Sequence, residues 1–73
     1  MEPIIFRVPV ESTSITSVGY ATVTQVLEVV FRRGTVYRYL SVPADVFAAF
    51  IAAPSKGRYF NANVRNHYQY VRA

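Results

Sequence analysis

The stretch "TQVLEVVFRRGTVYRYLSV", residues 24–42, decides the fold of this chain. Two runs rich in β-branched and aromatic residues flank Arg32-Arg33-Gly34, and runs of this kind predict a pair of strands. A three-residue hairpin loop needs a type I turn followed by a residue with positive φ, and Gly34 stands at that third position. The stretch therefore predicts an antiparallel β-hairpin.

The length of this loop also predicts the register of the hairpin. A three-residue loop pairs Leu27 with Tyr39, Glu28 with Arg38, Val29 with Tyr37, Val30 with Val36 and Phe31 with Thr35. The register is chemically consistent, because the only acid of the two strands, Glu28, then lies opposite Arg38. Because side chains alternate along a strand, Tyr37 and Tyr39 share one apolar face, which we expect helices to cover.

The segments around the hairpin predict one more strand and two helices. Residues 14–24, "SITSVGYATVT", predict a short strand that turns near Gly19 to Thr22. Residues 43–53, "PADVFAAFIAA", predict a helix with Pro43 at its first position and one apolar stripe. Beyond Pro54, Ser55 is the expected N-cap of a second helix over residues 56–68. The tail after this helix is either a short strand or a packed extension.

These elements predict a single α+β domain over residues 1–73. We expect an extended lead-in at residues 1–13 and a core at residues 14–72, with a small antiparallel sheet of about three strands followed by two helices packed on one face. A chain of 73 residues is near the lower size limit for folding without a disulfide or a metal. It contains no cysteine, which excludes disulfides and thiolate metal sites.

The N-terminal segment "MEPIIFRVPV" does not resemble a signal peptide, because it lacks a basic start and carries Arg7 and two prolines. No apolar run approaches the roughly 18 residues of a membrane span. We therefore expect a cytoplasmic protein that does not insert into a membrane.

The residue types needed for catalysis are sparse and scattered. The chain has one aspartate, three glutamates and a single histidine, His67, and none of them forms a recognisable catalytic or metal-ligating pattern. We read His67 as an ordinary surface or packing residue, and we expect no enzyme activity, no metal, no cofactor and no small-molecule substrate.

Positive charge is concentrated in the second part of the chain. From Val29 onward the only acid is Asp45, whereas the basic residues are Arg32, Arg33, Arg38, Lys56, Arg58, Arg65 and Arg72. Such a charge distribution attracts polyanions, which makes nucleic acid or an acidic protein the natural partner class. The alternative is a surface whose charges only keep the protein soluble.

The candidate contacts to nucleic acid lie at the start of the second helix and on the hairpin. Lys56 and Arg58 flank Gly57, which would let a phosphate approach the helix N-terminus or would only permit close packing. Arg65 is predicted to share a helix face with Arg58. The hairpin adds charge through Arg32, Arg33 and Arg38. For Tyr37 and Tyr39 we favour a place in the core over an exposed platform on which bases stack, and both readings stay open.

The spacing of several motifs resembles the KTSC domain, which is named for a C-terminal extension of some lysyl-tRNA synthetases. The matching residues are Tyr37-x-Tyr39, Val42-Pro43, Ser55-x-Gly57-x-Tyr59-Phe60-Asn61, Val64-Arg65 and Tyr68. The resemblance covers about residues 12–72. Departures are Ala21, where the family usually has an acid, and Gln69, where proline is common. The resemblance implies a domain without an assigned function, for which the synthetase context suggests RNA binding.

We therefore expect a non-enzymatic binding module for nucleic acid, with RNA ahead of DNA. The alternative is a protein-interaction or homodimerising domain, because the second sheet face carries an apolar strip of Val26, Val30, Val36 and Leu40 that needs a cover. The lead-in "IIFRVPV" is a candidate for that cover. A ribbon-helix-helix DNA binder is a third possibility, against which the hairpin within one chain argues.

Overall fold

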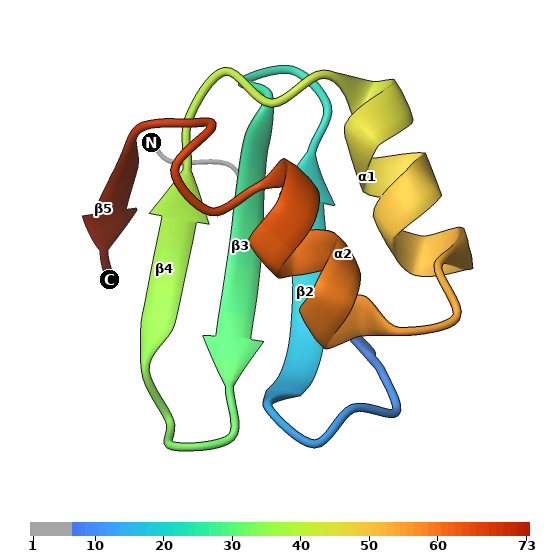
Figure 1. The fold of residues 1–73 in the computed structure, drawn as a ribbon. Helices are drawn as coiled ribbons and strands as arrows, with labels where there is room; N and C mark the ends of the chain where they lie inside the picture. The colour runs from blue at the N-terminus through green and yellow to red at the C-terminus, as the bar shows by residue number, and fades with distance from the viewer. Residues whose placement is uncertain (1–6) are drawn as a thin grey trace.

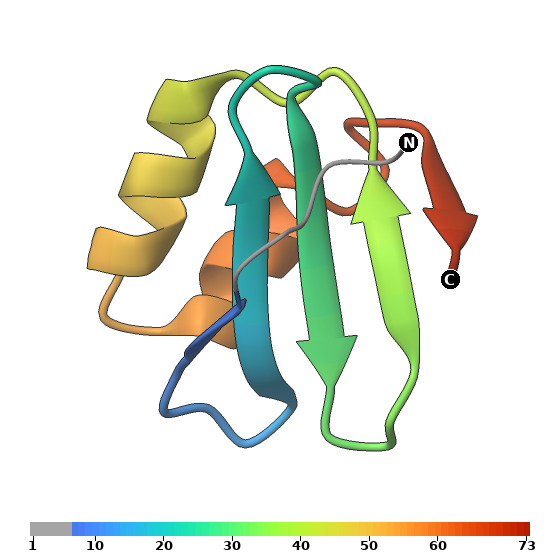
Figure 2. The ribbon, with the colours of Figure 1, turned by 180° about the vertical axis from the view of Figure 1, so that it is seen from behind.

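The computed structural model describes residues 7–73 and shows two layers, a five-stranded antiparallel sheet and two helices. The strands are β1 (Arg7–Pro9), β2 (Ile15–Ala21), β3 (Val26–Phe31), β4 (Val36–Tyr39) and β5 (Tyr70–Arg72), in the spatial order β1-β2-β3-β4-β5. The helices are α1 (Ala44–Ala52) and α2 (Lys56–Asn63). Both helices lie on the same face of the sheet, and the other face is free of them (Figures 1 and 2).

The predicted hairpin register is confirmed. Leu27 pairs with Tyr39, Glu28 with Arg38, Val29 with Tyr37 and Val30 with Val36. The loop closes through two backbone hydrogen bonds, in which the N–H groups of Phe31 and Gly34 donate to Thr35 and Phe31 at 2.9 and 2.8 Å. Gly34 has φ +92°, so the residue that the loop requires at positive φ is the glycine.

The prediction of about three strands is wrong, because β1 and β5 add one short strand at each edge. β1 pairs with β2 over three residues, inside the segment that was expected to be only an extended lead-in. β5 pairs with β4 over three residues and decides the open question of the tail in favour of a strand. Each strand is too short for an alternating pattern to show in the sequence. The first turn also differs, since β2 continues to Ala21 and the turn falls at residues 22–25.

α1 begins one residue later than expected, and α2 begins at the expected residue but is shorter than predicted. Pro43 is the N-cap of α1, with φ −65° and ψ 152°, and is not its first helical residue. Ser55 caps α2 as predicted, because its hydroxyl accepts a hydrogen bond from the Arg58 N–H at 3.3 Å. α2 ends at Asn63 and the chain continues in turns, with Asn66 at φ +67°. Asparagine tolerates this left-handed conformation and favours turns over helix interiors.

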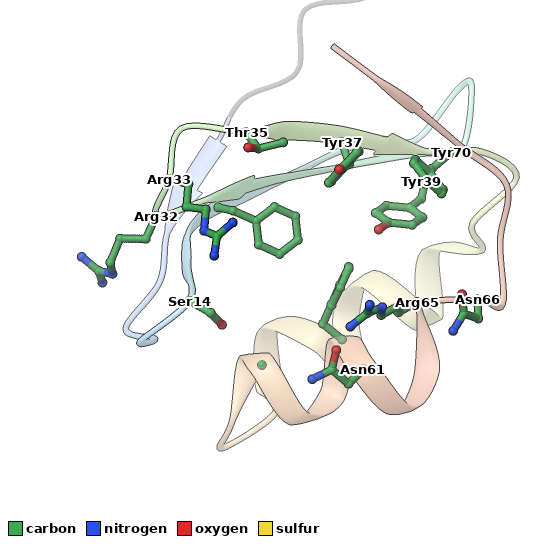
Figure 3. Close-up of a pocket in the computed structure, with 13 residues that line it drawn as sticks. Ser14, Arg32, Arg33, Thr35, Tyr37, Tyr39, Asn61, Arg65, Asn66 and Tyr70 are labelled. Atoms are coloured by element: carbon green, nitrogen blue, oxygen red, sulfur yellow. The ribbon is translucent and has the colours of Figure 1, made fainter.

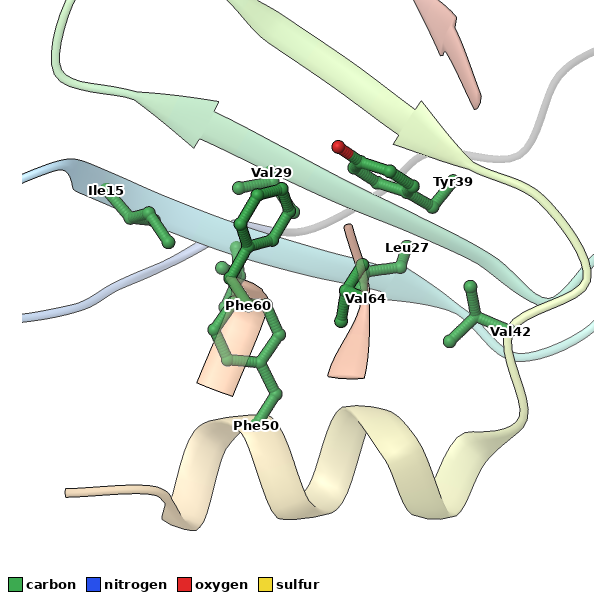
Figure 4. Packing of buried hydrophobic residues seen from close by; sticks show 9 residues of the cluster. Ile15, Leu27, Val29, Tyr39, Val42, Phe50, Phe60 and Val64 are labelled. Carbon is green, nitrogen blue, oxygen red and sulfur yellow. The ribbon is translucent and has the colours of Figure 1, made fainter. Parts of the chain in front are cut away.

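The core lies between the helical layer and the sheet (Figure 4). Its buried members are Ile15, Val18, Leu27, Val29, Tyr39, Val42, Phe50, Phe60 and Val64. α1 is held on β2 by a stack of Phe47 on Tyr20, with ring centroids 5.1 Å apart and an interplanar angle of 12°. Burial of these large side chains supplies the main stabilisation of a domain this small.

The opposite sheet face has a buried charge at its centre. Glu28 is only 2% exposed, and both of its carboxylate oxygens accept hydrogen bonds, one from Arg7 and one from Arg38 at 2.9 Å. The predicted Glu28–Arg38 pair is therefore present, and a second arginine joins it. The proposed cover "IIFRVPV" lies partly outside the described residues, and its described part contributes Arg7 and β1.

Candidate nucleic-acid interface

A pocket of about 590 Å³ opens on the helical side of the sheet, between the β3–β4 hairpin, α2 and β5 (Figure 3). Its aromatic lining residues are Phe31, Tyr37, Tyr39, Phe60 and Tyr70. Its basic lining residues are Arg32, Arg33 and Arg65. Its uncharged lining residues are Ser14, Thr35, Gly57, Asn61 and Asn66. No acidic residue lines it, so the pocket combines flat apolar surfaces with positive charge.

The aromatic side chains form one continuous array. Tyr37 meets Phe31 and Tyr70 edge to face, with centroids 5.7 and 5.0 Å apart. Phe60 reaches up from α2 and packs against Phe31 at 5.3 Å and Tyr39 at 5.5 Å. Each ring therefore has its position determined by at least one neighbour, and the array lines the pocket as a pre-formed surface.

Tyr39 and Tyr37 have different environments within this array. Tyr39 is 4% exposed and belongs to the core, which agrees with the preferred reading of the sequence. Tyr37 is only half-buried, packs against the core from its margin and lines the pocket. Tyr70 is 56% exposed, so the outer ring of the array is the accessible one.

The hydroxyl of Tyr39 faces the pocket. Burial raises the pKa of Tyr39 to about 12, with smaller effects of Tyr70 and Tyr37 in the same direction and an opposing effect of Arg65. The hydroxyl makes no hydrogen bond with any of residues 7–73. Every fully buried side-chain oxygen among the described residues has a hydrogen-bond partner, so the Tyr39 hydroxyl is not fully buried. It must therefore reach the solvent of the pocket, where a ligand could bind it.

Arg33 and Arg65 are the two available cations of the pocket. Both are exposed, and within residues 7–73 neither forms an ion pair or a side-chain hydrogen bond. Arg33 projects from the hairpin loop into the hollow, and Arg65 follows the end of α2 on the facing side (Figure 3). Two guanidinium groups without acidic neighbours form a suitable site for a phosphate.

Arg32 has a mainly structural position. Its guanidinium donates to the carbonyl oxygens of Ser12 at 2.6 Å and Thr13 at 3.2 Å, and its own N–H donates to Ser14. These bonds tie the hairpin loop to the loop that precedes β2. Figure 3 shows the side chain directed away from the hollow.

The remaining predicted contacts lie outside the pocket or near its edge. Lys56 donates through Nζ to the carbonyl oxygen of Ala53, and Arg58 is exposed but does not line the pocket. Arg38 lies on the other sheet face with Glu28. A Cβ added to Gly57 would come within 3.2 Å of the Ser14 hydroxyl, which favours the reading that this glycine permits close packing.

Tyr70, Asn61 and Asn66 also line this site, although the sequence did not predict them as members of it. Tyr70 pairs with Tyr39 across β4 and β5, and the two rings lie 5.5 Å apart. The only signal in the sequence was the aromatic character of the tail. No pattern along the chain assigns Asn61 or Asn66 to a site, and only the closure of α2 over the hairpin brings them to the pocket.

Residues 7–73 contain neither a metal-binding cluster nor a membrane-spanning helix. No group of three or more His, Cys, Asp or Glu side chains there could hold a metal ion. Within the same residues, neither helix has the length and apolar character of a membrane span.

The fold and the sequence match those of known proteins. The family model of the KTSC domain matches residues 11–68, and the chain belongs to this family. The crystal structure of a KTSC domain protein from Yersinia pestis superimposes with a TM-score of 0.93 at 34% identity, covering 96% of this chain and 99% of that one. The α+β architecture with two helices on one face is thus a property that the two proteins share.

Two groups of relatives differ in length. An uncharacterized protein of Stutzerimonas stutzeri is 45% identical over 67 residues, which cover 90% of this chain and 94% of that protein. A lysine–tRNA ligase of Trichormus variabilis is 37% identical over 60 residues, which cover 82% of this chain but only 11% of the ligase. A ligase of Nostoc sp. matches over the same length at 35%.

Proposed function

We propose that this chain is a non-enzymatic module that binds single-stranded RNA through the face that carries the pocket. The observation that carries the proposal is the combination of an aromatic lining with Arg33 and Arg65 on opposite sides and no acidic lining residue. Proteins that hold single-stranded nucleic acid combine a positive groove with aromatic rings on which bases stack. Related sequences inside lysine–tRNA ligases, whose name refers to tRNA, make RNA the preferred nucleic acid.

Positive residues around the pocket would extend the contact along the RNA backbone. Arg72 pairs with Tyr37 across β4 and β5 and so lies on the same sheet face, and Arg58 is exposed on α2. Lys56 lies at the start of the same helix. Contacts of these side chains with phosphates would position a strand without reading its sequence.

Binding should be measured by fluorescence anisotropy with single-stranded RNA, duplex RNA and duplex DNA at increasing salt. We expect the tightest binding to single-stranded RNA, with a log–log salt slope of about −0.7 for each phosphate contacted. The double variant Arg33→Glu/Arg65→Glu should lose binding, whereas Arg33→Lys/Arg65→Lys keeps the charge and should keep the slope. Lys56→Glu/Arg58→Glu should weaken binding of all sequences alike. Failure of every nucleic acid to bind below about 100 μM at low salt would rule the proposal out.

Homodimerisation through the second sheet face is the other candidate. Val26, Val30, Val36 and Leu40 form the strip on that face, and each is partly rather than fully exposed. The charged group of Arg7, Glu28 and Arg38 interrupts the strip, which weakens it as an apolar interface. Sedimentation of the wild type and of Val30→Lys tests it, because a dimer formed by this face should dissociate in the variant.

A further inference from the structure

The exposed ring of Tyr70 and the half-buried ring of Tyr37 form a corner and not a flat platform. Tyr37 and Tyr70 have centroids 5.0 Å apart and planes at 84°. A base that stacks on the face of one ring therefore meets the other ring at its edge, and a second base has no parallel surface on which to continue. A platform for several successive bases would need rings spaced along a strand with their faces exposed.

The size of the pocket agrees with a single flat ligand. Its volume of about 590 Å³ lies within the range of roughly 300–1,000 Å³ that is typical of sites for one small molecule. The walls come from β3–β4, α2 and β5, so the pocket is bounded on several sides. A base inside a duplex could not enter it, because its faces are occupied by neighbouring base pairs and its edge by its partner.

Polar groups are available both for a phosphate and for the edge of a base. Arg33 and Arg65 face the hollow from the hairpin and from the end of α2, and among residues 7–73 they have no acidic partner. The side-chain amides of Asn61 and Asn66 line the same pocket, and neither is engaged by another described residue. Each amide offers two donors and one acceptor, which suits the hydrogen-bonding edge of a base.

From these observations we infer that the pocket binds one unstacked nucleotide of a single-stranded RNA, with its base against Tyr37 and Tyr70 and its phosphate between Arg33 and Arg65. The inference rests on the proposed RNA-binding function and narrows it to loops, bulges and strand ends, where a base is free to turn out of its stack. The module would thus recognise RNA by one nucleotide and hold the neighbouring phosphates without specificity.

The test uses the full chain and short RNAs that differ only in their bases. One RNA has about six nucleotides, the length of a typical single-strand site, and its counterpart carries the same phosphates but no bases. A third RNA restores one central base. The intact RNA should bind about tenfold more tightly than the abasic one, the loss expected for one stacked base. One restored base should recover this gain in affinity. The only remaining difference should be statistical, because the intact RNA has several bases that can occupy the pocket and the third RNA has one.

Three variants assign the base and phosphate contacts. Tyr70→Leu keeps apolar bulk at an exposed position but removes the ring, and it should reduce the ratio of intact to abasic affinity to about one, whereas Tyr70→Phe should keep it. Arg65→Gln and Arg58→Gln each remove one positive charge, the first from the pocket lining and the second from an exposed position on α2 outside the pocket. Because Arg33 and Arg65 would bind the phosphate, the pocket should bind 5′-AMP more tightly than adenosine. Arg65→Gln should abolish this preference, and Arg58→Gln should leave it unchanged. Thermal melts confirm that each variant is folded.

Each outcome decides between the two levels of the proposal. If RNA binds with a steep salt dependence but intact and abasic strands bind equally, the single-nucleotide site is wrong and the general RNA-binding function stands. A gain that needs two or more restored bases also contradicts the single-nucleotide site, because it indicates a platform. Binding of 5′-AMP without binding of RNA overturns both the RNA-binding function and the inference that the nucleotide belongs to an RNA strand. If an acidic peptide such as polyglutamate binds as tightly as RNA, positive charge alone explains the binding. That result also overturns both the RNA-binding function and the single-nucleotide site.

Discussion

Arg7 on the edge strand β1 reaches Glu28 two strands away by passing over Gly19. The three residues stand in one cross-strand row, with Arg7 opposite Gly19 and Gly19 opposite Glu28. Because Gly19 has no side chain, it places no Cβ between the guanidinium and the carboxylate. Arg38 meets the same carboxylate from β4, so one buried acid links the outermost strand to the hairpin.

This group makes stability depend on pH in the acid range. Burial raises the pKa of Glu28, but hydrogen bonds and attraction from Arg7 and Arg38 outweigh it and hold the pKa below the ordinary value of 4.5. Glu28→Gln should lower the free energy of unfolding by about 2 kcal/mol at pH 7, the value of charged hydrogen bonds. The contribution is present above the unfolded pKa and is lost as pH falls through the lower folded pKa.

Urea denaturation at neutral and acid pH measures this effect. The difference between wild type and Glu28→Gln should shrink as pH falls below the ordinary value of 4.5 and through the lower folded pKa of Glu28. Glu11→Gln is the control, because that carboxylate is exposed and its replacement should change stability by less than about 0.5 kcal/mol. A difference that stays constant from pH 7 to strong acid would contradict the assigned role of Glu28.

The effect of a substitution at Gly34 on stability should depend only on how readily the new residue adopts positive φ. No atom lies within 4 Å of the place where a Cβ would be, so steric contact plays no part, whereas φ of +92° is unfavourable for a side chain. Gly34→Val should cost about 1 kcal/mol or more, and Gly34→Asn should cost less because asparagine accepts positive φ more readily. Chemical denaturation of both variants gives the comparison, and equal stabilities would show that the loop rearranges.

Tyr39 should contribute to stability through its ring and not through its hydroxyl. The ring is 4% exposed and packs on Phe60, so Tyr39→Ala should destabilise by roughly 3–5 kcal/mol. Tyr39→Phe keeps the ring and removes a hydroxyl without a partner among residues 7–73, so we expect a change below about 0.5 kcal/mol. A loss of several kcal/mol in Tyr39→Phe would show that the hydroxyl has a structural bond.

The same residue should make the protein sensitive to alkali. The folded pKa of Tyr39 is about 12 against an ordinary 10.0, because burial disfavours the phenolate. Its contribution to stability is fully present below pH 10 and is lost as pH rises toward 12, since only the unfolded chain releases the proton in this window. Denaturation of wild type and Tyr39→Phe between these pH values should show a steeper loss in the wild type. Parallel curves would contradict the raised pKa.

The cap of α2 gives a local test of the helix that carries Asn61. Ser55 accepts the Arg58 N–H, so Ser55→Ala should cost about 1 kcal/mol. Ser55→Asp keeps an acceptor and adds a negative charge at the positive end of the helix dipole, so it should retain wild-type stability. Thermal unfolding of the three proteins ranks them, and equal values for serine and alanine would show that the cap is dispensable.

The local parts of the fold could be predicted from the sequence because short-range rules govern them. Loop length and Gly34 determine the hairpin register within residues 26–39. Ser55 predicts a helix start from a bond to a residue three positions away. The partition of Tyr39 into the core follows from side-chain alternation, which is also a local property.

The edge strands and the pocket depend on contacts between distant segments. β1 and β5 are three residues long and exist because β2 and β4 present edges to them, so no pattern within either segment announces a strand. The same holds for the cations. The sequence shows seven basic residues after Val29, but only packing determines that Arg32 holds a loop and that Arg7 joins the predicted Glu28–Arg38 pair. Arg33 and Arg65 remain available because the fold brings no acid near them, a condition that depends on three-dimensional neighbours and not on spacing along the chain.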